Sequence, residues 1–113
     1  ARPYIEGGNA ITPSIVLTEL RRWLLSEIEA GRRQEQEMRK IMSFIELTTA
    51  VLPLNTSLAI KAGEIDYLMK RRIKDWPIAD SIIYATAKEN AAEIVTEDPH
   101  FKELEDVIFI EQE

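Results

Sequence analysis

The sequence contains no cysteine and a single histidine, His100. The lack of cysteine excludes disulfide bonds and thiolate metal sites, and one histidine cannot form a zinc site that needs several imidazoles. Any metal ion held by this chain must therefore be bound by oxygen ligands, which favours magnesium or manganese. Oxygen ligands are plentiful, because Asp and Glu together number 20. The search for a metal site is thus a search among the carboxylates.

Long hydrophobic runs and an excess of positive charge are also missing. No stretch is long and apolar enough to span a membrane, and no signal peptide is recognisable, so we expect a cytoplasmic protein. The formal net charge of −6 argues against a passive nucleic-acid binder, which is usually basic. It does not argue against a metal-dependent nuclease, because there the bound cation faces the phosphate.

The 113 residues, of which 45% are hydrophobic and 30% charged, suit one small globular domain over residues 1–113. Helical periodicity, capping residues and short β-rich runs predict the elements. The predicted helices are residues 13–30, 33–48, 56–72 and 77–89, and the predicted strands are residues 10–12, 50–54, 93–96 and 107–110, with a helical turn at 99–104. Strands that alternate with helices are typical of the α/β class, in which helices cover a parallel sheet.

Asp80 is the acidic residue whose position is hardest to explain as ordinary surface. It lies in the first turn of the helix predicted at 77–89, which is apolar nearly all round and should be buried. A buried carboxylate without compensation costs several kcal/mol, so Asp80 should have a partner or a metal ion. The alternative is that it stabilises the helix N-terminus, which is worth roughly 0.3–1 kcal/mol.

Two further carboxylates occupy unusual places. Glu19 lies beside the apolar stripe of the first predicted helix, although its long side chain could reach water there or pair with Arg22. Asp98 follows the strand at 93–96, and ligands of open α/β sheets bind beyond the carboxyl ends of the strands. Asp98 could equally cap the next helical turn. Thr96 could orient Asp98 or a metal-bound water, or be an ordinary strand residue.

Phosphodiester hydrolysis is a reaction that needs such acids. A divalent metal ion can activate the attacking water and stabilise the leaving oxygen, provided that carboxylates hold it with open positions for substrate. Hard cations need several oxygen ligands, so the carboxylates must converge from distant parts of the chain.

Three segments, taken in order, resemble the motifs of PIN domains, a family of metal-dependent nucleases. A short strand followed by a helix with a glutamate is matched by ITPSIVLTEL at 11–20. An aspartate that opens an alanine-rich apolar helix is matched by IADSIIYATA at 78–87. A strand that ends in Thr-x-Asp, followed by phenylalanine, is matched by IVTEDPHF at 94–101. The chain most resembles small prokaryotic PIN proteins, many of which are VapC-type toxins of toxin–antitoxin pairs.

The resemblance implies a three-layer PIN-like α/β fold with a short parallel sheet between helices, and an endoribonuclease that depends on Mg2+ or Mn2+. It implies that Glu19, Asp80 and Asp98 are the catalytic metal ligands, with Thr96 as a supporting residue. It also implies a homodimer and a small antitoxin partner. The helix at 33–48 and the start of the next helix offer apolar residues for such contacts.

One element of the family pattern has no match. PIN domains begin with an apolar, central strand that ends in an aspartate, and the only acid before Glu19 is Glu6. We therefore expect this strand and its aspartate to precede Ala1. A parallel sheet without its central strand has two unpaired edges and a gap in its core, so we expect the chain as given to be stable only if something fills the gap. Without the aspartate, the chain as given could be inactive. A non-catalytic PIN-like interaction module is the alternative function.

Four cations lie just before the helix of Asp80. They are Lys70, Arg71, Arg72 and Lys74. They could contact the RNA backbone, or they could be favourable charges at a helix C-terminus. His100 could serve in acid–base chemistry, although a structural or exposed role is favoured.

Overall fold

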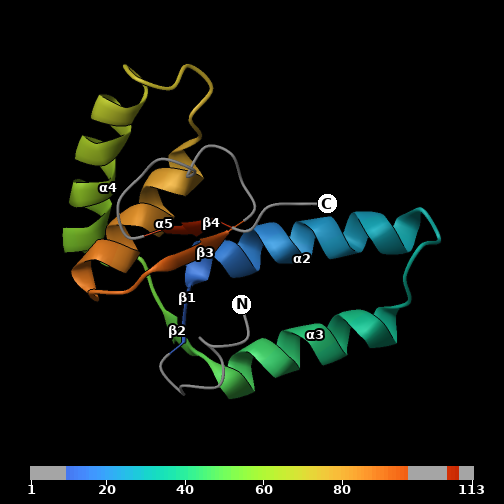
Figure 1. Ribbon diagram of the computed structural model, residues 1–113. Coiled ribbons are helices and arrows are strands. Elements are labelled where there is room, and N and C mark those ends of the chain that lie inside the picture. The colour runs from blue at the N-terminus through green and yellow to red at the C-terminus, as the bar shows by residue number, and fades with distance from the viewer. Residues whose placement is uncertain (1–9, 97–106, 110–113) are drawn as a thin grey trace. The chain divides into compact units, whose positions relative to one another are not determined.

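The computed structural model describes residues 10–96 and 107–109. The elements in these residues are β1 (Ile11–Pro13), α2 (Ser14–Glu29), α3 (Glu35–Thr48), β2 (Ala50–Leu52), α4 (Thr56–Met69), α5 (Ile78–Glu89), β3 (Ile94–Thr96) and β4 (Val107–Phe109) (Figure 1). Helices and parallel strand pairs confirm the α/β class. None of the described helices is long and apolar enough to cross a membrane. The chain divides into two compact units, Ala1–Pro53 and Leu54–Glu113. The prediction of one domain stays a prediction.

In the first unit, β1 and β2 form a parallel pair in which Thr12 lies opposite Val51. Parallel neighbours need a long crossover, and here α2 and α3 supply it as two helices that run alongside each other (Figure 1). The Thr12 and Thr49 hydroxyls hydrogen-bond at 2.7 Å, and Thr49 Oγ1 also donates to Ile45 O. The strand is thereby tied to the end of α3.

The turn between α2 and α3 has a sequence-encoded geometry. Gly31 has φ of 79°, a left-handed conformation that glycine adopts without the steric cost of a Cβ. The Gly31 N–H donates to Ile28 O and the Arg32 N–H to Glu27 O, which is the hydrogen-bond pattern of a Schellman motif. At the start of α3, Gln34 and Glu37 form a capping box.

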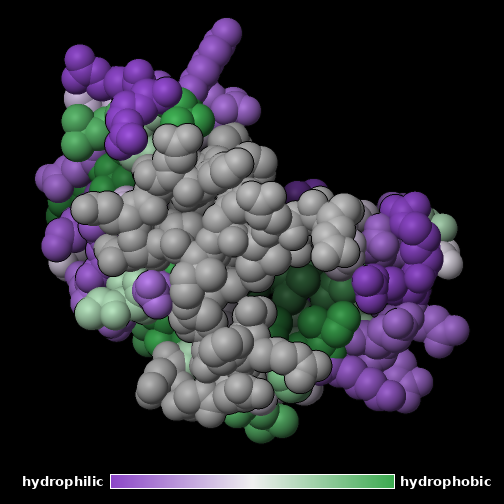
Figure 2. Space-filling model, viewed as in Figure 1, coloured by the Kyte–Doolittle hydropathy of each residue, from purple (hydrophilic) through white to green (hydrophobic). Residues whose placement is uncertain are grey.

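Apolar side chains gather along the α2–α3 pair, and hydrophilic residues border them at the end that holds the turn (Figure 2). Among the residues of α2, only Leu24 is fully buried. Trp23, which the sequence places on the apolar face, is 44% exposed, and Leu47 on α3 is 85% exposed. The first unit therefore leaves large apolar side chains at its surface.

In the second unit, α4 packs against α5, and β3 forms a parallel pair with β4 (Figure 1). Asn55 caps α4, because its Oδ1 accepts the Leu58 N–H at 2.9 Å. Among the described residues of this unit, the buried apolar side chains form two clusters. One contains Met69, Trp76, Tyr84, Ala87 and Ile94, and the other contains Leu58, Ala62 and Ala85.

The predicted elements agree with the described ones to within one residue except at three ends. The helix predicted from residue 33 begins at Glu35, the strand at 50–54 ends at Leu52, and the helix predicted to residue 72 ends at Met69. After Met69 the N–H groups of Arg71 and Arg72 bond three residues back, so the chain leaves the helix in a series of tight turns. The helical turn predicted at 99–104 lies outside the described residues.

Candidate functional site

Asp80 lies in the first turn of α5, where its backbone N–H donates to Pro77 O at 3.1 Å. The residue is 7% exposed, and its Oδ2 atom is buried. The predicted burial of this carboxylate is confirmed. Its position agrees with both predicted roles, because a first-turn aspartate can hold a cation and also stabilises the helix N-terminus. Both Asp80 oxygens are hard donors, so the chemistry fits a divalent cation such as Mg2+.

Next to Asp80, the buried hydroxyl of Ser81 joins two other parts of the unit. It accepts the Trp76 indole N–H at 2.6 Å and donates to Asp66 Oδ1, which lies on α4, at 3.0 Å. The other Asp66 oxygen forms an ion pair with Lys70 Nζ at 3.0 Å. We call the hydrogen-bonded set Asp66, Trp76 and Ser81 the α4–α5 network.

Asp66 is not among the predicted site residues, although its position in the sequence carries a signal. Asp66 follows Ala62 by four residues and Leu58 by eight, and it precedes Met69 by three, so it lies on the buried stripe of α4. The same criterion singles out Glu19. The hydrogen-bond partner of Asp66 is Ser81, which lies 15 residues away on another helix, and helical spacing carries no information about that contact.

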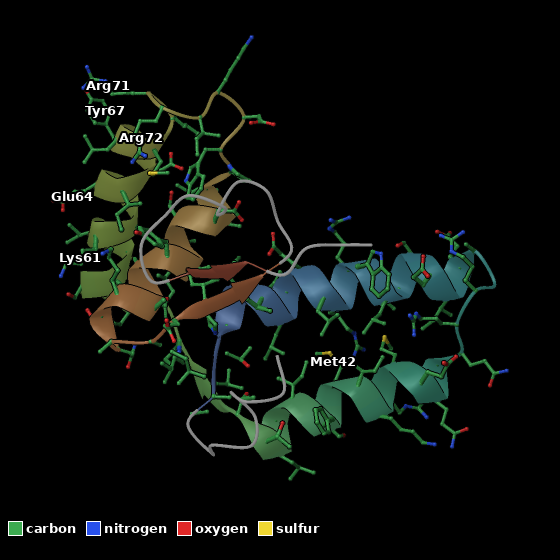
Figure 3. The ribbon with its side chains drawn as sticks, viewed as in Figure 1. Met42, Lys61, Glu64, Tyr67, Arg71 and Arg72 are labelled. Carbon is green, nitrogen blue, oxygen red and sulfur yellow. The ribbon has the colours of Figure 1, made fainter. Side chains whose placement is uncertain are left out.

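The four predicted RNA-contacting cations are all exposed, but they differ in their contacts. Lys70 is paired with Asp66, and the Arg71 guanidinium lies 5.6 Å from the centre of the Tyr67 ring. Figure 3 shows Arg71 and Tyr67 together on the side of α4 that faces away from α5. The four residues follow the last turn of α4, which itself contains no cation. Lys70 is the C-cap of α4, and both predicted roles of the four cations, contact with the RNA backbone and favourable charge at the helix C-terminus, stay predictions.

Glu19 lies on α2 and is exposed. This agrees with the alternative in which its long side chain reaches water, and it also leaves the carboxylate accessible to a cation. Further along α2, Glu27 Oε2 accepts a hydrogen bond from Arg32 Nε at 2.8 Å and forms an ion pair with Arg32 Nη2 at 2.7 Å. That hydrogen bond lowers the pKa of Glu27 from its ordinary value, with the positive charges of Arg32 and Arg33 acting in the same direction. Arg33 lies over the Trp23 ring, 5.2 Å from its centre.

The predicted metal ligands belong to different parts of the chain. Glu19 belongs to the unit Ala1–Pro53 and Asp80 to the unit Leu54–Glu113, and Asp98 lies outside the described residues. The same is true of His100, while Thr96 is described only as a backbone residue of β3. Within residues 10–96 and 107–109, no three His, Cys, Asp or Glu side chains form a group that could hold a metal ion. The ligand roles of the three acids stay predictions.

A model of one protein family, described as PIN domain, matches residues 1–107 of the chain. Comparison with curated proteins and with solved structures gives no match. The matched range contains the three motif segments and the whole of the α4–α5 network.

Proposed function

Because the chain belongs to the PIN-domain family, we propose that it is a metal-dependent endoribonuclease whose ligands are Glu19, Asp80 and Asp98. PIN domains are generally nucleases and typically use divalent metal ions. At the level of individual residues, the proposal rests on the buried carboxylate of Asp80 in the first turn of α5. It lies in the segment that resembles the third family motif.

In the proposed site, each residue of this chain has a limited task. Asp80, Glu19 and Asp98 supply carboxylate oxygens that suit Mg2+ or Mn2+. When bound, such an ion activates water and stabilises the leaving oxygen of a phosphodiester. Burial in the first turn of α5 restricts the rotamers of Asp80 and so orients its carboxylate. Thr96 would orient Asp98.

The cations after α4 divide into two groups in this proposal. Lys70 neutralises Asp66, so it is less available to a phosphate. Arg71, Arg72 and Lys74 are exposed and would contact the RNA backbone. Replacing any of these three by glutamine should reduce the salt dependence of RNA binding by about 0.7 in log–log slope, the value expected for one phosphate contact on a single strand. An unchanged slope for all three would remove them from the RNA interface.

The proposal includes the finer identity of a cytoplasmic VapC-type toxin that forms a homodimer and binds a small antitoxin. It is supported by exposed apolar residues, which are Phe44 and Leu47 on α3 and Ile60 near the start of α4. Leu47→Lys should convert the dimer to a monomer in light scattering, whereas Lys40→Gln on the same helix should not. A monomeric parent protein would refute the dimer.

The nuclease proposal is tested by cleavage of RNA with added Mg2+, with EDTA as the metal-free control. Asp80→Asn should abolish cleavage, because the amide has the shape of the carboxylate without its charge. Asp75→Asn, at an exposed position before α5, is the matched control and should cleave normally.

A first strand before Ala1 stays a prediction, so the same assay is run on a version that carries the upstream coding sequence. If the longer protein cuts no RNA, or if its Asp80→Asn variant cuts as well as the parent, the nuclease proposal fails. The alternative, a non-catalytic PIN-like interaction module, then takes its place.

A further inference from the structure

Three buried polar groups come together from three parts of the second unit in the α4–α5 network. Asp66 comes from α4, Trp76 from the segment between the helices, and Ser81 from the first turn of α5. An indole N–H can only donate, so Ser81 Oγ must accept it. The single hydroxyl hydrogen of Ser81 is then left for Asp66 Oδ1, which as a carboxylate oxygen can only accept. The direction of every hydrogen bond in the network is therefore determined.

A buried polar network is a thermodynamically unfavourable choice for a core. Burying a carboxylate, a hydroxyl and an indole N–H is unfavourable unless all of them find partners, and apolar side chains of similar volume would stabilise the fold as well or better. What a fully satisfied network adds is a single orientation of the elements that carry it. Here those elements are the end of α4 and the beginning of α5.

We infer that Asp66, through its hydrogen bond with Ser81, is a positioning residue that sets the direction of the Asp80 carboxylate. This inference rests on the proposed metal-dependent function. Asp80 and Ser81 are consecutive residues of one helical turn, so a bond that holds Ser81 against α4 also determines the rotation of that turn about the axis of α5. Asp80 itself need not touch the network.

Helix geometry gives the size of the displacement that the Asp80 carboxylate would undergo. A side-chain tip lies about 5–6 Å from the helix axis, so rotating the turn by about 10° moves it by roughly 1 Å. Mg2+ requires nearly ideal octahedral geometry with ligands at about 2.0–2.1 Å. A displacement of roughly 1 Å is therefore enough to weaken or lose one ligand. The loss of one hydrogen bond in the network should therefore cause a large loss of affinity for the metal ion.

The test compares two buried hydroxyls of α5. Ser81→Ala removes the hydroxyl that bonds to Asp66. Thr86→Val is the matched control, because Thr86 is 2% exposed and its hydroxyl donates within the same helix, to Ile82 O at 2.8 Å. Binding of Mn2+ is followed by electron paramagnetic resonance, cleavage of RNA by initial rates, and folding stability by urea denaturation.

We expect Ser81→Ala to raise the Kd for Mn2+ by about 10-fold or more, in the range seen when residues that orient metal ligands are changed. The cleavage rate at a fixed, subsaturating Mg2+ concentration should fall, and the KM for RNA should stay the same. Thr86→Val should leave both the Mn2+ affinity and the rate unchanged. Asp66→Asn should also lower the Mn2+ affinity and the cleavage rate without changing the KM for RNA, but by a smaller factor, because the hydrogen bond to a neutral acceptor is weaker than one to a carboxylate. That second variant keeps the test decisive if Ser81→Ala does not fold.

Three outcomes would overturn the inference. If Ser81→Ala and Thr86→Val lose Mn2+ affinity equally, in proportion to their loss of stability, the network is structural only. If the parent binds Mn2+ and cuts RNA but both network variants do the same, positioning by Asp66 fails while the proposed function stands. If neither the parent nor the version that carries the upstream coding sequence binds Mn2+ or cuts RNA, the function and the inference fail together.

Discussion

Replacing Asp66 by alanine should lower the free energy of unfolding by about 2–3 kcal/mol. A hydrogen bond to a charged group contributes about 1.5–3 kcal/mol, and this one is buried. The ion pair with Lys70, whose side chain is 50% exposed, adds about 0–1 kcal/mol, since solvent screens it. The variant also leaves the Ser81 hydroxyl hydrogen without its acceptor in a fully buried place. For a chain of this size, the melting temperature should fall by roughly 8–12 °C.

The assay is urea denaturation of the parent, Asp66→Ala, Ser81→Ala and the double variant, followed by circular dichroism. The two single changes remove the same hydrogen bond, so their effects should not add, and the coupling energy should be about 1–2 kcal/mol. The double variant should be nearly as stable as Ser81→Ala, because it leaves neither partner of the bond without the other. A loss below about 0.5 kcal/mol for Asp66→Ala, the range of ordinary surface changes, would refute the reasoning, as would additive effects.

Two further predictions concern two glycines and the loss of stability at acid pH. Gly31→Ala should lower the free energy of unfolding by about 1–2 kcal/mol because of its φ of 79°. Gly63→Ala, inside α4 with open space around a new Cβ, should raise the free energy of unfolding by about 0.5–1 kcal/mol, and thermal melts distinguish the two variants. The pKa of Glu27 is lowered in the folded protein, chiefly by the hydrogen bond from Arg32, so its contribution is present above the unfolded-state pKa and is lost as pH falls through the lowered one. Glu27→Gln should therefore flatten the acid limb of a stability–pH profile, and an unchanged acid limb would contradict this.

Much of the local structure could be predicted from the chain itself. Helical periodicity, Asn55 as an N-cap and glycine after α2 are all local signals, and the elements that they predict agree with the described ones to within a few residues. The sequence predicts the end of α4 too late, because a run of good helix formers continues beyond Met69 while the backbone already turns. Propensity describes what a segment tolerates, whereas the turn brings Trp76 into one cluster with Tyr84 of α5.

The sequence predicts the burial of some candidate site residues better than that of others. The burial of Asp80 followed from a helix that is apolar on nearly every side, and the structure confirms it. Glu19 lies beside an apolar stripe but is exposed, because a long side chain at the boundary can extend to water. Trp23, which helical spacing places on the apolar face of α2, is partly exposed beside Arg33. Position on a helical face predicts burial well only when the face is surrounded by other apolar residues.

By itself, the sequence determined the α/β class, the order of the elements, the oxygen-only chemistry of any metal site, and the motifs that place the chain among PIN domains. These are properties of residue type and of spacing along the chain. Only the tertiary structure showed that Asp66, Trp76 and Ser81 form one buried network next to Asp80. Its hydrogen bonds join side chains on separate elements, and no periodicity within one helix specifies which residue of the next helix it will face.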